Sequence, residues 1–173
     1  MNTKGFTLLE VIAAIFLMTI GVIGTLSLVS QAIISSQITS SRLVASYLAQ
    51  EGIEIVKNLR DTNFLQIRRE LITEDQWTQG LTGCSEGCEA DYNDLALTPT
   101  ANRYLNIDAG FYQYSGFGTQ TPFKRKITIN IQDLSNPPDG IPDKMKVQVE
   151  VSWTERLRTY QVTAQENIYK WIQ

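Results

Sequence analysis

Residues 5–30, GFTLLEVIAAIFLMTIGVIGTLSLVS, decide the fold of this chain. Glu10 is the only charged residue in this run, and no charge follows it across residues 11–41. A helix needs about 20 apolar residues to cross the hydrocarbon core of a bilayer. Because the run is apolar on every side rather than along one stripe, a soluble domain would have to bury it completely. The run therefore predicts a membrane-spanning helix.

The composition limits the architecture and chemistry of the rest of the chain. The chain has 173 residues, so about 140 are left for one soluble domain with its own core. Its 15 basic and 18 acidic residues give a net charge of −3, without the strongly basic balance of a dedicated nucleic-acid binder. The sequence contains no His, which excludes Ser-His and Cys-His nucleophile pairs. No acid pair or phosphate-binding loop stands out, so we expect a protein that is not an enzyme.

Glu10 distinguishes the apolar run from ordinary export signals. A cleaved secretory signal has an apolar core of about 7–15 residues followed by a small-residue cleavage site, and the run here is longer. A plain signal anchor accounts for Lys4 before the run and for the next charge at Arg42, with the N-terminus held in the cytoplasm. Neither class accounts for a carboxylate inside the span, which costs about 2–3 kcal/mol near the bilayer centre.

The residues around Glu10 resemble the leader and cleavage site of type IV prepilins and type II secretion pseudopilins; they read Lys4-Gly5-Phe6-Thr7-Leu8-Leu9-Glu10-Val11. The resemblance implies a short basic leader containing Lys4, cleavage after Gly5 by a prepilin peptidase, and N-methylation of Phe6. It also implies that Glu10 neutralises the N-terminal ammonium of a neighbouring subunit. A buried amine and a buried carboxylate are each costly alone and less costly together, so their pairing favours assembly.

The same resemblance implies a structural role. The chain would be a minor pilin or pseudopilin of a type IV pilus or a type II secretion-like filament. Its partners would be the prepilin peptidase/N-methyltransferase, other pilin or pseudopilin subunits, the inner-membrane assembly platform and the lipid bilayer. It would span the cytoplasmic membrane once, with its N-terminus in the cytoplasm and its head outside, and join a periplasmic or extracellular filament. The alternative is a membrane-anchored binding module with the same signal, either an adhesin or a DNA-uptake pilin, although nucleic acid is the less favoured ligand.

Helical spacing continues beyond the apolar run. Apolar residues recur on one helical face from Ile38 to Leu59, and the first Pro is Pro99. This pattern predicts one helix from about residue 6 to residue 60, which is roughly 80 Å long. A second short helix is expected after it, with Asp61 or Thr62 as its cap.

The last third of the chain has the period-two pattern of β-strands. Apolar and polar residues alternate over residues 123–131, 145–153 and 160–168, and the short connection between the last two runs predicts an antiparallel hairpin. Their buried faces are expected to pack on the second half of the long helix, which gives an α+β, pilin-like fold. We divide the chain into a leader (1–5), the transmembrane and assembly half of the helix (6–34) and a globular head (35–173).

Two groups of residues in the head are candidate sites. Cys84 and Cys88 are the only cysteines; a disulfide between them is permitted outside the cytoplasm, and free thiols are the alternative. Asp133, Asp139 and Asp143 surround a turn that contains Pro and Gly. Carboxylates around such a turn can bind calcium, but the spacing is not that of an EF-hand, and a solvated turn is the alternative. No other cofactor is expected.

The remaining basic and aromatic clusters are interpreted as structural. Lys124-Arg125-Lys126 is expected to form a solvated face, although strand alternation separates Arg125 from its two neighbours. The aromatic residues are expected to lie in the core or on a sheet face rather than in a sugar-binding platform; they are Tyr92, Tyr104, Phe111, Tyr112 and Tyr114.

Overall fold

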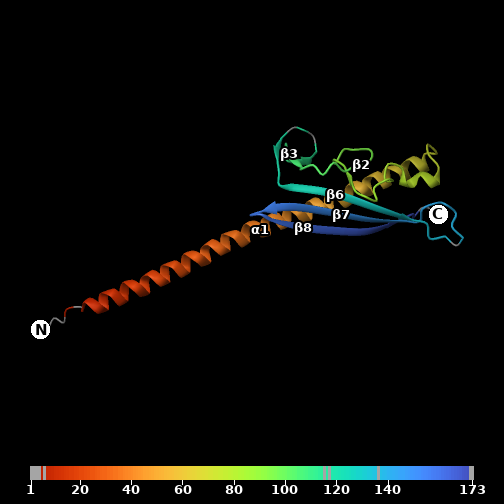
Figure 1. Ribbon diagram of the computed structural model, residues 1–173. Coiled ribbons are helices and arrows are strands. Elements are labelled where there is room, and N and C mark those ends of the chain that lie inside the picture. The colour runs from red at the N-terminus through yellow and green to blue at the C-terminus, as the bar shows by residue number, and fades with distance from the viewer. Residues whose placement is uncertain (1–4, 6, 115, 117, 136, 172–173) are drawn as a thin grey trace. The chain divides into compact units, whose positions relative to one another are not determined.

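The computed structural model describes residues 5, 7–114, 116, 118–135 and 137–171 (Figure 1). The chain divides into two compact units, Met1–Ser41 and Arg42–Gln173. From here on, the head means the second unit, whereas the head predicted from the sequence is residues 35–173. Helix α1, Leu8–Arg68, begins in the first unit and ends in the head. Among the described residues it is the one helix long and apolar enough to cross a membrane, and none of its apolar window is buried within the structure.

Helix α1 extends further toward the C-terminus than the sequence pattern predicts. The predicted end was near residue 60, whereas α1 continues to Arg68. The expectation of a separate helix starting after Asp61 is therefore wrong, because residues 61–68 belong to α1. The segment after α1 contains the short 3₁₀ helix η1, Glu74–Thr78.

The extra turns of α1 are stabilised by contacts with η1. Phe64 is buried and stacks on Trp77, with ring centroids 5.8 Å apart. The Asn63 side-chain amide donates to the carbonyls of Trp77 at 3.0 Å and Gln79 at 2.8 Å. Polar Asn63 is thus buried with its hydrogen bonds satisfied, which a pattern based on apolar spacing does not anticipate.

The head contains an antiparallel five-stranded sheet with the strand order β2-β1-β6-β7-β8. A small three-stranded sheet has the order β4-β3-β5. The strands are β1 Cys88–Glu89, β2 Thr98–Pro99, β3 Asn106–Asp108, β4 Phe111–Gln113, β5 Thr119–Gln120, β6 Phe123–Gln132, β7 Lys144–Glu155 and β8 Arg158–Tyr169. The three long strands and the β7–β8 hairpin confirm the α+β arrangement predicted from the sequence.

One face of the large sheet packs on the head portion of α1. In the register of β6 and β7, Ile127 lies opposite Val149, and both side chains are fully buried. They belong to the same core as Ala45, Leu48 and Val56 of α1, which is contiguous through the head. The alternation of buried and partly exposed positions along β7 explains why period two was visible in the sequence.

Gly52 is the point of closest approach between α1 and the sheet. A Cβ atom at Gly52 would lie 2.7 Å from Val149 Cγ1 and 3.3 Å from Arg125 Cδ. We expect Gly52→Ala to lower the unfolding free energy of the head by about 1–3 kcal/mol, despite the better helix propensity of Ala. Chemical denaturation followed by tryptophan fluorescence measures this change.

A Val149→Ala background provides the control for this prediction. Removing the valine methyl groups opens space for the new Cβ, so Gly52→Ala should cost less there than in the wild-type protein. Equal costs in both backgrounds would contradict the steric explanation.

Candidate functional site

The N-terminal processing and assembly residues lie at and before the start of α1. Gly5 is exposed and outside regular structure, whereas Lys4 and Phe6 lie outside the described residues. The Glu10 backbone N–H donates to the Thr7 carbonyl at 3.1 Å and lies 3.3 Å from the Thr7 hydroxyl. Thr7 thus caps the helix, and Glu10 occupies its first turn, where a negative charge is favoured by the helix dipole.

The apolar side chains that follow Glu10 have no cover within the chain. The large apolar residues of α1 between Leu8 and Ile33 are all exposed, and a Cβ at Gly21 or Gly24 would meet no atom within 4 Å. An isolated chain in water could not sustain this surface. The arrangement fits lipid or the helices of other chains around α1, with Glu10 as the one charge among the exposed apolar residues 8–33.

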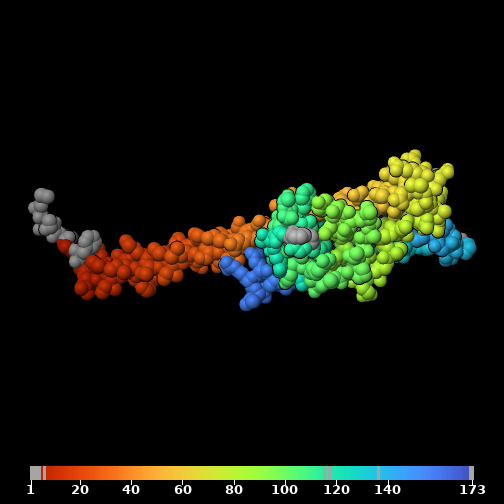
Figure 2. Space-filling model, turned by 90° about the horizontal axis from the view of Figure 1, so that it is seen from above, coloured from red at the N-terminus to blue at the C-terminus, as the bar shows by residue number. Residues whose placement is uncertain are grey.

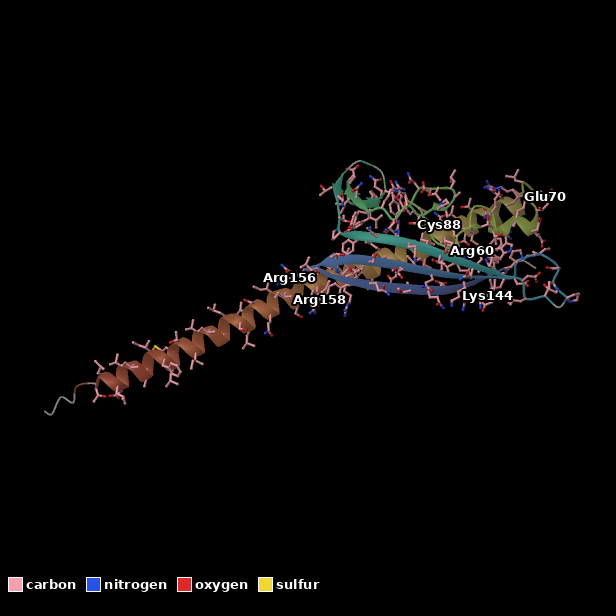
Figure 3. All side chains as sticks on the ribbon, viewed as in Figure 1. Arg60, Glu70, Cys88, Lys144, Arg156 and Arg158 are labelled. Carbon is pink, nitrogen blue, oxygen red and sulfur yellow. A yellow bond between two sulfur atoms is a disulfide. The ribbon has the colours of Figure 1, made fainter. Side chains whose placement is uncertain are left out.

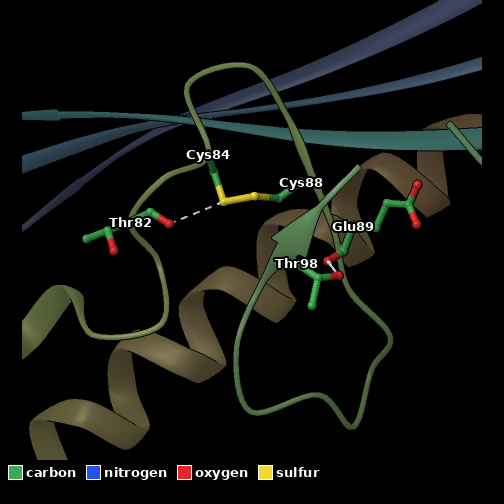
Figure 4. Close-up of a disulfide and its surroundings, with 5 residues drawn as sticks. All are labelled: Thr82, Cys84, Cys88, Glu89 and Thr98. Atoms are coloured by element: carbon green, nitrogen blue, oxygen red, sulfur yellow. Dashed lines mark hydrogen bonds between the residues drawn. A yellow bond between two sulfur atoms is a disulfide. The ribbon is translucent and has the colours of Figure 1, made fainter. Parts of the chain in front are cut away.

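The two cysteines form a disulfide in the segment that connects η1 to β6, residues 79–122, which we call the connecting segment (Figure 4). Both sulfur-bearing side chains are buried. The Ile129 N–H of β6 donates to the Cys84 carbonyl at 3.0 Å, and Cys88 pairs with Ile127 across the ladder. The disulfide therefore has a structural role, because it closes the short loop before β1 and both of its cysteines contact β6 through the backbone.

The interpretation of Lys124-Arg125-Lys126 as a solvated face is wrong for Arg125. Its side chain is only 2% exposed. Nη2 donates to the Ala90 carbonyl at 2.7 Å, and Nη1 lies 3.3 Å from Glu51 Oε1 on α1. Tyr114 donates its hydroxyl to the Arg125 carbonyl at 2.7 Å. Arg125 is two residues before the buried Ile127 and so lies on the same face of β6. The alternation in the sequence therefore already indicated that Arg125 is buried.

A second buried charge, Glu89, was not anticipated. Its side chain is 1% exposed and accepts hydrogen bonds from Arg103 Nε at 2.9 Å and the Thr100 hydroxyl at 2.9 Å. The Ala101 N–H also donates to it, at 2.7 Å. Burial opposes ionisation of Glu89, but the hydrogen bonds from Arg103, Thr100 and the backbone outweigh it and lower its pKa. Glu89 thus joins β1 to residues 100–103 within the connecting segment, and Arg125 of β6 joins that segment to α1.

Tyr114 completes this buried polar cluster. Burial raises its pKa to about 12, against the smaller opposing effect of Arg125. Its phenol therefore remains neutral and can donate to the Arg125 carbonyl at any ordinary pH. The other aromatic residues divide between core and surface: Tyr112 packs edge-on against Phe123, whereas Tyr92 and Phe111 stack on each other at 4.8 Å and are about half exposed.

The acidic loop between β6 and β7 uses its carboxylates to organise its own backbone. Asp133 accepts from the N–H groups of Ser135 at 2.9 Å and Gly140 at 2.8 Å, and these bonds lower its pKa. Asp143 accepts from the Leu134 N–H at 2.7 Å, and the Asp139 carboxylate accepts from a backbone N–H two residues on. In the part of the chain that the structure describes, no group of three or more Asp, Glu, Cys or His side chains is placed to hold a metal.

These hydrogen bonds lead to a prediction about calcium. Because backbone amides already satisfy Asp133, Asp139 and Asp143, we expect millimolar CaCl₂ to leave the thermal unfolding midpoint of the purified chain unchanged. Differential scanning fluorimetry with MgCl₂ as the ionic-strength control measures this. A calcium-specific rise in the midpoint that disappears in Asp139→Asn would instead show that the loop rearranges to bind the ion.

Comparison with known proteins bears on the N-terminus. Residues 1–26 match the family described as the prokaryotic N-terminal methylation motif. This is a prepilin-type N-terminus. No curated protein and no solved structure gave a significant match to the chain. The motif and the α+β architecture together support a type IV pilin- or pseudopilin-like protein.

The motif also indicates how the chain is processed, which partners it has and where it is located. It supports a pilin-type precursor that prepilin peptidase processes and that assembles with other pilin subunits. Pilins are structural subunits rather than enzymes. Together with the exposed apolar part of α1, the motif supports anchoring of this pilin-like protein in a membrane.

Proposed function

We propose that this pilin-like protein is a minor pilin or pseudopilin, a structural subunit of a type IV pilus or a type II secretion-like filament. The proposal rests on one observation above all: the N-terminal methylation motif spans residues 1–26 and overlaps an apolar helix that has no cover of its own. A helix of this kind is stable in lipid before assembly and among other apolar helices afterwards.

The proposed sequence of events begins with insertion of α1 into the cytoplasmic membrane, the N-terminus inside and the head outside. Prepilin peptidase cleaves the bond after Gly5, and the new amino group, on Phe6, is methylated. Glu10 is then the fifth residue of the mature chain. Its carboxylate pairs with the ammonium of a neighbouring subunit, which removes the cost of two separate charges in an apolar environment.

The processing step gives a direct test. Mass spectrometry of protein extracted from membranes of cells that express prepilin peptidase should show a chain that begins at methylated Phe6. Gly5→Val is the matched control, because it enlarges the residue before the cleaved bond and leaves α1 unchanged; it should retain Met1 in the same cells. Wild-type protein that keeps Met1 despite an active peptidase would contradict the proposal.

A binding role for the head is the second candidate, and one surface feature favours it. A hollow of about 280 Å³ on the large sheet is lined by residues that include Lys124, Lys126 and Asn102. In the β6–β7 register, Ser152 lies opposite Lys124 and Glu150 opposite Lys126. Two lysines can contact the phosphates of DNA, but so few contacts give little affinity at physiological salt. A gel-shift titration with duplex DNA at several salt concentrations distinguishes this role from filament assembly alone.

A further inference from the structure

The tip of the β7–β8 hairpin carries an unusual turn. Glu155 pairs with Arg158, so Arg156 and Leu157 are the two central residues. Both have positive φ, 50° and 64°, as in the type I′ turns that favour Asn and Gly. A bulky side chain in this conformation is a genuine outlier. Leu157 is moreover 100% exposed, so no packing within the head accounts for its presence.

The charges at this tip are unlike those of the chain as a whole. Arg156 and Arg158 flank Leu157 and both are exposed, whereas the whole chain has a net charge of −3. The nearest acid, Glu155, has its Oε2 atom buried without a hydrogen-bond partner among the described residues. The tip therefore presents an apolar side chain between two cations. This combination fits a surface that has anionic groups above an apolar layer.

The tip lies at the end of the head where α1 enters it. The start of β7 lies near η1, because Trp77 Nε1 donates to the Pro142 carbonyl at 2.7 Å. Further along β7, Val149 faces Gly52. The remaining residues of β7 extend the strand by about 20 Å in the direction of Arg42, where the head begins. Figure 3 shows Arg156 and Arg158 at this end, and the hairpin protrudes there in Figure 2.

We propose that the hairpin tip docks on the membrane surface before assembly, with Leu157 in the interfacial layer and Arg156 and Arg158 on anionic headgroups. This inference rests on the membrane anchoring in the proposed function. A bilayer takes about 20 residues of the uncharged run into its hydrocarbon core, and with its headgroup layers it is about 40–45 Å thick, or roughly 30 helical residues. Its outer headgroup layer therefore lies along the last part of the run, which ends before Arg42. Basic residues beside an exposed apolar side chain bind such surfaces in two ways: the apolar side chain is buried in the interface, and the cations are attracted to anionic lipids. Both contributions depend on lipid composition.

A single thiol at the tip makes the contact measurable. Cys84 and Cys88 are paired with each other, so Leu157→Cys supplies the one thiol available for an environment-sensitive NBD label. The full-length chain is placed in bilayers of phosphatidylcholine alone, or mixed with phosphatidylglycerol. We expect a blue-shifted emission and quenching by headgroup-proximal spin-labelled lipid in the anionic bilayers. Leu95→Cys is the matched control, because Leu95 is 87% exposed and lies beside Leu59 and Gln66, far along α1 from Arg42.

Charge removal tests the headgroup part of the proposal. In anionic bilayers, replacing Arg156 and Arg158 with Gln should lower the ratio of docked to undocked tips about fivefold for each arginine removed, and in phosphatidylcholine it should change little. If the Leu157→Cys variant fails to fold, Thr159→Cys, exposed beside it, carries the same label and the same expectation.

Three results would overturn the docking proposal. One is the absence of quenching at the tip in anionic bilayers when carbonate extraction shows that the chain is inserted; the proposed function then stands and docking alone fails. Another is a spectral shift that vanishes on dilution with lipid, which would assign the tip to a neighbouring copy of the chain. Failure of the chain to insert would overturn both proposals together.

Discussion

Glu10→Ala is expected to leave membrane insertion intact and to exclude the chain from filaments. The substitution removes the one charge from the span of α1, so the helix remains compatible with a bilayer. In the proposed filament, it also leaves the ammonium of a neighbouring mature subunit without a partner in an apolar environment. Breaking a buried pair in this way costs about 3–5 kcal/mol, which corresponds to more than a hundredfold in the assembly equilibrium. Immunoblots of sheared filaments and of washed membranes measure the two fractions.

Two variants control for this interpretation. Glu10→Asp keeps the charge on a shorter side chain and should retain part of the assembly. Glu54→Ala removes an exposed acid further along α1, whose partner is Lys57 at 3.2 Å, and should assemble normally, because exposed ion pairs contribute little. Wild-type amounts of Glu10→Ala in sheared filaments would show that this carboxylate does not pair during assembly.

Glu89→Gln is expected to lower the unfolding free energy of the head by about 1.5–3 kcal/mol, the range for hydrogen bonds to a charged group. The amide keeps the shape of the side chain but loses the negative charge that faces Arg103, 2.7 Å from Nη2. One of its two polar ends also becomes a donor, which cannot accept from Arg103 or from the Ala101 N–H. Urea denaturation followed by circular dichroism measures the loss. Glu86→Gln, an exposed change in the same segment, should stay within about 0.5 kcal/mol of wild type.

The same carboxylate predicts a dependence of stability on pH. The pKa of Glu89 is lower in the folded head than its ordinary value of 4.5. Its ionisation therefore stabilises the head above pH 4.5, and this stabilisation is lost as the pH falls from 4.5 through the lower folded pKa. The Glu89→Gln variant should lack this part of the acid transition. Parallel acid titrations of both proteins would contradict the assignment if their stability difference did not shrink at low pH.

The elements that a repeating pattern specifies were predictable from the sequence. The apolar run before Arg42 required a helix, and alternation over β6, β7 and β8 required strands with one buried face. In both cases the pattern is visible because burial repeats with the period of the backbone. The end of α1 was missed because Asn63 is buried through hydrogen bonds to η1 rather than through apolar contacts.

The polar interior of the head lacks such a pattern. Glu89 receives its hydrogen bonds from Thr100, Ala101 and Arg103, and these residues lie in a segment whose strands are two or three residues long. A strand that short gives no readable period. The sequence showed that Arg125 lies on the buried face of β6. It could not show that Glu51 and Ala90 are its partners, because these contacts depend on how α1 and the connecting segment pack on the sheet.

The Gly52 contact has a mechanical consequence. Val149 occupies the space that a larger residue at position 52 would need, and Arg125 holds the adjacent Glu51. Moving α1 by one residue along the sheet, a rise of about 1.5 Å with a turn of about 100°, would bring a side chain against Val149 and break the geometry of the ion pair. Tension applied along the helix axis is therefore resisted at this contact as well as by the apolar core, so a weakened contact here should let the head shear from its helix at lower force.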